Sequence, residues 1–175
     1  MRPGRCLACN APSRPFGAAL GLHGHGLRER HQWGPVEVGS VPALIAIPVR
    51  RYLCRSCGAV VVVGPRGLVR RRLYSAGAIA LALALYGVAG LAPAEVRSRV
   101  SPLRIVGPSA AAGWASLRRW CRAVRARRLF PAVRALPIDA TLRQVAARAA
   151  TTLAACAPGA EGLALEAAAF IGASM

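Results

Sequence analysis

Short apolar runs separated by turn-forming residues predict β-structure in the first part of the chain. The runs have the length and the Val and Ile content typical of strands, and one of them ends at Gly64-Pro65. We expect a hairpin around Gly39 and Ser40, and a Pro- and Gly-rich loop over residues 10–26. The predicted strands are residues 36–38, 44–47, 47–53 and 59–63.

Apolar residues at helical spacing predict an α-helical region beyond residue 72. The expected helices cover residues 75–88, 93–100, 109–128 and part of 135–155, with a weak Ala-rich helix over 163–171. Ser75 and Asp139 are suited to cap two of them, and Pro93 to open a third.

The helix over residues 109–128 has one apolar side and one basic side. An apolar stripe recurs at i, i+3, i+7 and i+10, and is formed by Trp114, Leu117, Cys121 and Val124. At 100° per residue, Ser116, Arg119, Arg122 and Ala123 face away from it, with Arg118 and Arg125 on its flank. Because no acidic residue occurs from 109 to 134, no ion pair within the helix neutralises this basic side.

The uncharged segment 73–94 has a second interpretation, as a membrane anchor. It follows Arg70, Arg71 and Arg72, and its length is just sufficient to span a bilayer. Ala and Gly make up much of it, however, and they drive insertion weakly. We therefore expect a buried helix in a small helical domain, and the membrane anchor is the alternative.

Composition points to an anionic partner. The net charge is +18, and all 24 basic residues are Arg. A charge of this size favours nucleic acid or an anionic membrane surface. The Arg residues are divided between segments 1–72 and 73–148, and segment 149–175 contains none. Because no apolar leader precedes Cys6, we expect a cytoplasmic protein.

Two C-x₂-C pairs carry the clearest chemistry. Cys6 and Cys9 form one pair and Cys54 and Cys57 the other, and four such thiolates make a closed tetrahedral zinc site. Asn10 and Gly58, which follow the pairs, are residue types that accept the positive φ of a tight turn. A redox pair and a disulfide framework are the alternatives. A ligand role for His23 or His25 is a further one, although four Cys already complete the site.

Together these patterns predict an α+β protein with a zinc ribbon at residues 1–72 and a helix-turn-helix-like domain at 73–134. Residues 135–175 are expected to add an Ala-rich helix and a partly disordered tail. The predicted cofactor is one structural Zn²⁺, because so few large apolar residues could not hold the first 72 residues together unaided.

The chain resembles the zinc-ribbon and helix-turn-helix front end of bacterial insertion-sequence transposases and of small proteins derived from them. The resemblance rests on the first C-x₂-C and on segments 24–30, 47–58, 70–75 and 114–120, the last containing Leu-Arg-Arg-Trp. It implies transposon-end or related DNA as partner. The chain departs from a full transposase because Asp139 is its one Asp, and because the connection 101–108 is longer than a tight helix-turn-helix turn.

We therefore expect a non-catalytic DNA-binding protein, with a transposase or another protein as a further partner. No Ser/His/Asp order, phosphate loop or open metal site indicates an enzyme. The competing interpretations are a protein-interaction module with a structural zinc ribbon, and the membrane protein anchored by residues 73–94. The predicted DNA contacts are Arg118, Arg119, Arg122, Arg125, Arg70, Arg71, Arg72, Arg50 and Arg51.

Overall fold

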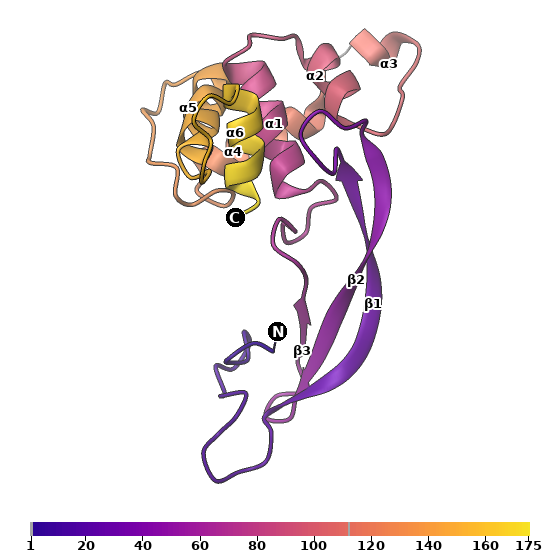
Figure 1. The fold of residues 1–175 in the computed structure, drawn as a ribbon, viewed down its shortest axis with the longest axis vertical. Coiled ribbons are helices and arrows are strands. Elements are labelled where there is room, and N and C mark those ends of the chain that lie inside the picture. The colour runs from indigo at the N-terminus through magenta and orange to yellow at the C-terminus, as the bar shows by residue number, and fades with distance from the viewer. Residues whose placement is uncertain (1, 112) are drawn as a thin grey trace. The chain divides into compact units, whose positions relative to one another are not determined.

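The computed structural model describes residues 2–111 and 113–175, and it shows an α+β protein (Figure 1). Its residues form two compact units, the first made of Met1–His31 and Ala46–Pro65 and the second of Gln32–Ile45 and Arg66–Met175. This grouping differs from the predicted boundaries at residues 72 and 134. Segment 32–45 and the C-terminal segment 135–175 both belong to the helical unit, because both contribute apolar side chains to its core.

A three-stranded antiparallel sheet has the order β1-β2-β3. Its strands are β1 (Leu22–Gly34), β2 (Ala43–Cys54) and β3 (Val60–Val63). β2 and β3 pair antiparallel, with Arg50 opposite Val63 and Leu53 opposite Val60. Strand structure is therefore confirmed over 44–47 and 47–53, which form one longer strand β2, and over 60–63, whereas Ala59 precedes β3.

Two predictions about the sheet are wrong. β1 begins at Leu22, inside the segment predicted as loop, and continues through Gly34. Residues 36–38, predicted as strand, lie in the turn before β2. The Ser40 hydroxyl explains the turn, because it accepts hydrogen bonds from the backbone N–H groups of Val36 (3.0 Å) and Glu37 (3.1 Å).

The second unit is built from helices. They are α1 (Ala76–Gly87), α2 (Pro93–Val100), α3 (Pro108–Ala111), α4 (Ala115–Arg125), α5 (Leu142–Ala154) and α6 (Leu165–Ala173). Ser75 caps α1 as predicted, since its hydroxyl accepts a 3.0 Å hydrogen bond from the N–H of Ala78.

Two helix boundaries differ from the predictions. The single helix expected over 109–128 is divided into α3 and α4, since Gly113 has a φ of +78° that no helix tolerates. Ala112, within that predicted helix, lies outside the described residues. Thr141, and not Asp139, is the N-cap of α5, because Thr141 and Gln144 form a reciprocal capping box.

α1 is the central helix of the second unit and contacts α2, α4, α5 and α6 (Figure 1). Most of its side chains are buried, and they lie on all sides of the helix. A helix surrounded in this way has no face for charged residues, which accounts for the uncharged composition of this segment. Among the described residues, no helix has both the length and the apolar character needed to cross a bilayer.

An aromatic cluster joins segment 32–45 to the helices within the second unit. Tyr74 packs edge-to-face against Trp33, Trp114 and Trp120, with ring centroids 5.0–5.7 Å apart. The Tyr74 hydroxyl donates a 2.9 Å hydrogen bond to the Ser101 hydroxyl. Burial of Trp114 is confirmed, whereas the contribution of Trp120 was not predicted.

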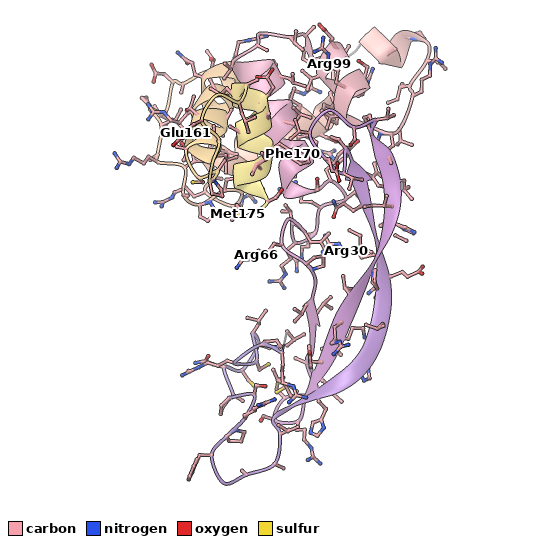
Figure 2. All side chains as sticks on the ribbon, in the orientation of Figure 1. Arg30, Arg66, Arg99, Glu161, Phe170 and Met175 are labelled. Carbon is pink, nitrogen blue, oxygen red and sulfur yellow. The ribbon has the colours of Figure 1, made fainter. Side chains whose placement is uncertain are left out.

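Small residues allow α1, α5 and α6 to approach closely. Phe170 projects from α6 toward α1 and fills the space left by Gly77 (Figure 2). A Cβ at Gly87 would overlap the backbone nitrogen of Ala147 in α5, and one at Gly172 would overlap the carbonyl oxygen of Leu153. The Ala and Gly content of these segments is therefore a packing requirement.

We expect Gly87→Ala to destabilise the helical unit by about 1–3 kcal/mol, because α1 and α5 would have to separate. For a chain of this size the thermal midpoint should fall by roughly 3–10 °C, measured by the helical circular dichroism signal. Gly4→Ala is the control, since a Cβ there meets nothing within 4 Å. Equal midpoints for the two variants would contradict this packing.

Candidate metal centre

The two C-x₂-C pairs form turns with the same backbone hydrogen bonds. The N–H of Asn10 donates to the carbonyl of Cys6 (3.0 Å), and the N–H of Gly58 donates to the carbonyl of Cys54 (2.9 Å). Asn10 and Gly58 have φ values of 59° and 71°, as predicted from their residue types. Each turn therefore presents its two sulfurs on one side of a short loop.

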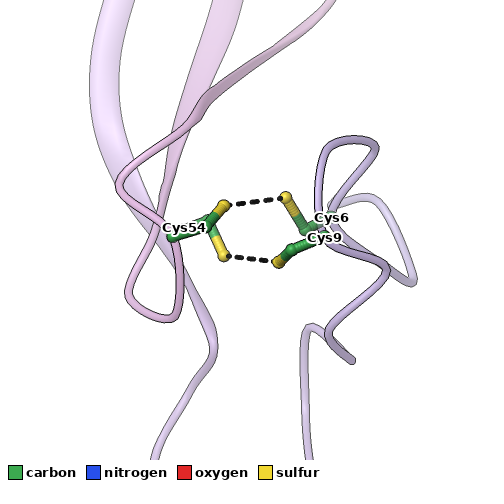
Figure 3. Close-up of side chains that lie close together, drawn as sticks. Cys6, Cys9 and Cys54 are labelled. Carbon is green, nitrogen blue, oxygen red and sulfur yellow. Dashed lines mark hydrogen bonds between the residues drawn. The ribbon is translucent and has the colours of Figure 1, made fainter.

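The four sulfurs converge with the spacing of a tetrahedral site (Figure 3). The Sγ atoms of Cys6 and Cys57 lie 3.8 Å apart and those of Cys9 and Cys54 3.7 Å apart, and all four lie within 4.8 Å of one another. Metal–sulfur bonds of about 2.3 Å in a regular tetrahedron place neighbouring sulfurs about 3.8 Å apart. These four thiols are free, and they could bind one metal ion.

The local electrostatics favour a cation at this place. Burial raises the pKa of the Cys54 thiol, but the N–H groups of Cys57 and Ser56 and the neighbouring thiols outweigh it and bring the pKa to about 6. The N–H of Ala59 lowers the pKa of Cys57, but the surrounding thiols and burial raise it to about 12. Four thiolates so close together therefore require a bound cation to ionise together.

The metal centre forms part of a small apolar core. Cys6 and Cys54 are buried in a cluster with Leu22, Tyr52 and Val61, whereas Cys9 and Cys57 are exposed. The N–H of Arg55, in the second turn, donates a 2.9 Å hydrogen bond to the carbonyl of Gly21 just before β1. A metal ion bound by the four cysteines would tie the two turns together and add to this small core.

The histidines lie outside this centre. His23, His25 and His31 belong to β1, where two were expected in loop. In the part of the chain that the structure describes, the four cysteines are the one group of three or more His, Cys, Asp and Glu side chains whose ligand atoms converge. The alternative of a histidine ligand gains no support.

The predicted two-sided character of the third helix is found in α4. The stripe residues Trp114, Leu117, Cys121 and Val124 are buried. The four arginines predicted to contact DNA are exposed, namely Arg118, Arg119, Arg122 and Arg125. Ala123, predicted to face away from the core, is instead buried, because α4 is covered by α5 as well as by α1.

Arg125 and Arg97 of the helical unit donate hydrogen bonds to backbone carbonyls of other segments. Arg125 donates to the carbonyl of Ala140 in the segment before α5. Arg97, which the sequence analysis missed, is buried in α2 and donates to the carbonyls of Ala110 (2.5 Å) and Gly113 (3.4 Å). Its position three residues before the buried Val100, on the same side of α2, is the signal that could have identified it.

The remaining predicted DNA contacts are divided between the units. Arg50 and Arg51 lie on β2 in the first unit, and segment 70–72 precedes α1 in the second. Arg50, Arg70 and Arg71 are exposed, whereas Arg51 and Arg72 are half-buried. No protein-family model, curated protein or solved structure matches this chain.

Proposed function

We propose that this chain is a non-catalytic DNA-binding protein stabilised by a structural zinc ion, and that it derives from or works with an insertion-sequence transposase. The observation that carries this proposal is the row of exposed arginines on α4, opposite a buried apolar stripe. A helix that is anchored on one side and cationic on the other is suited to contact DNA phosphates or base edges.

Zinc is the metal that suits four cysteine ligands best. Thiolates in tetrahedral geometry select zinc or iron, and a closed Cys₄ site without an open coordination position is typical of structural zinc. The two turns, with β2 leading into the second and β3 leaving it, support a zinc ribbon.

A helix-turn-helix-like arrangement of α1, α2 and α4 is the second part of the proposal. It is supported by a shared core, in which Val96 and Val100 of α2 and Leu117 of α4 pack with α1. The segment 101–114 replaces the usual tight turn. Arg97 holds this segment through two carbonyl groups, which fixes where α4 begins.

We expect the purified protein to bind random duplex DNA at low salt, with an affinity that falls steeply as salt increases. Three to four contacted phosphates would give a slope of roughly −3 in a plot of log K against log salt. Fluorescence anisotropy across a salt series measures this slope. Absence of binding at low salt by zinc-loaded protein would refute the proposal.

One observation favours the competing function, a protein-interaction module. Phe16 is fully exposed, and Leu7, which lies within the first cysteine turn, is 81% exposed. Exposed apolar side chains of this size are common at protein-binding surfaces. Replacing both with Ser should leave DNA binding unchanged if the DNA proposal is correct.

A further inference from the structure

Three arginines converge on a hollow in the first unit. The hollow has a volume of about 210 Å³, and Arg2, Arg50 and Arg51 line it. Gly24 and Gly26 of β1 form part of its wall, and a Cβ at either position would meet nothing within 4 Å. A ligand can therefore approach the backbone of β1 closely at this place.

The arginines in this hollow have unused hydrogen-bonding capacity. The Nε atoms of Arg2 and Arg51 are buried and have no hydrogen-bond partner among the described residues. The Arg2 guanidinium lies 5.8 Å from the centre of the Tyr52 ring. No carboxylate lines the hollow. The exposed guanidinium of Arg50 would therefore donate to an external anion, with Arg2 and Arg51 adding positive charge beside it.

A larger and mainly apolar hollow adjoins the basic one. It has a volume of about 470 Å³ and shares Leu27 and Arg50 with its neighbour. Pro48, Val63 and Pro65 complete most of its wall. A cationic hollow next to an apolar one matches a phosphate group joined to a sugar, which is the repeating unit of a nucleic-acid backbone.

We propose that Arg2, Arg50 and Arg51 form a phosphate-binding pocket in the metal-bearing unit. Planar guanidinium groups bind phosphate through paired hydrogen bonds, and three of them match the tetrahedral set of phosphate oxygens better than the two coplanar oxygens of a carboxylate. The identification of this phosphate as part of a DNA backbone rests on the function proposed above. Free phosphate compounds share the same chemistry and are separated from DNA by the experiment.

The test compares Arg50→Gln and Arg51→Gln with Arg28→Gln, an exposed arginine of β1 that does not line the hollow. All variants should keep one zinc per chain. In the two pocket variants, affinity for random duplex should fall about tenfold and the salt slope should decrease by about 1. The Arg28→Gln protein should stay close to the unmodified one. Pyrophosphate binding, followed by phosphorus NMR, tests the free-phosphate source.

A second measurement uses the unmodified protein, so that its result does not depend on whether the variants fold. Phenylglyoxal labelling of the unmodified protein, read by mass spectrometry, should show that duplex DNA protects Arg2, Arg50 and Arg51 but not Arg28. Equal behaviour of pocket and control arginines would overturn the pocket while leaving DNA binding intact. Protection by pyrophosphate without any duplex binding would support the pocket and refute the proposed function. Binding of neither would overturn both.

Discussion

Replacing Cys54 with Ser is expected to abolish metal binding and unfold the first unit. Cys54 is buried in the apolar cluster of this unit, and its Sγ lies 3.7 Å from that of Cys9. A serine hydroxyl stays protonated and cannot replace the thiolate. Structural zinc in small domains has an apparent binding free energy on the order of 10 kcal/mol at neutral pH, which exceeds what a cluster of this size supplies.

Elemental analysis should give about one zinc per chain for the unmodified protein and almost none for Cys54→Ser. The helical circular dichroism signal should remain, because the core of the second unit contains none of the four ligands. Cys156→Ser is the matched control, since Cys156 is exposed and lies outside the cluster. Retention of a full equivalent of zinc in Cys54→Ser would exclude this residue as a ligand.

The metal centre could be predicted because its determinants are local. Each C-x₂-C turn is closed by hydrogen bonds within six residues, and Asn10 and Gly58 are the residues that its backbone requires. The helix cap at Ser75 was predictable for the same reason. Only the close approach of the two turns depends on the rest of the fold. That approach was also predictable, because a tetrahedral metal site needs all four cysteines together.

Features that depend on distant partners were not predicted. β1 has a polar sequence with little alternation, and it is a strand because β2 pairs with it. Burial of Ala123 depends on α5, which follows it in the sequence. Trp33 lies far in sequence from Trp114 and Trp120, so the aromatic cluster leaves no periodic signal.

The Ala-rich C-terminus shows why composition alone was misleading. It was expected to be weakly helical and in part disordered, yet α6 buries Phe170 against Gly77. Ala and Gly give almost no helical periodicity in hydrophobicity, but they permit close helix contacts. The packing of such segments is set by shape and is therefore hidden from a hydrophobic pattern.

The second large effect is expected for Arg119→Ala and Arg122→Ala. Both side chains are exposed on α4, and neither occurs in an ion pair or side-chain hydrogen bond recorded for the described residues. If they contact base edges, each substitution should cost about 1–3 kcal/mol on a selected DNA site, which is roughly 5- to 150-fold in affinity. Random duplex should be affected much less.

Two comparisons give this measurement its meaning. Arg71→Ala, in the segment before α1, should weaken all sequences alike and lower the salt slope by about 1, as a phosphate contact does. Arg148→Ala removes the same charge from an exposed position on α5 and should have little effect. A site selected from random duplex and a scrambled site serve as the two ligands.

If Arg119→Ala and Arg122→Ala weaken binding to both ligands equally, α4 contacts phosphates only. If they resemble Arg148→Ala, α4 does not contact DNA, and the arginine row that carries the proposed function has another role.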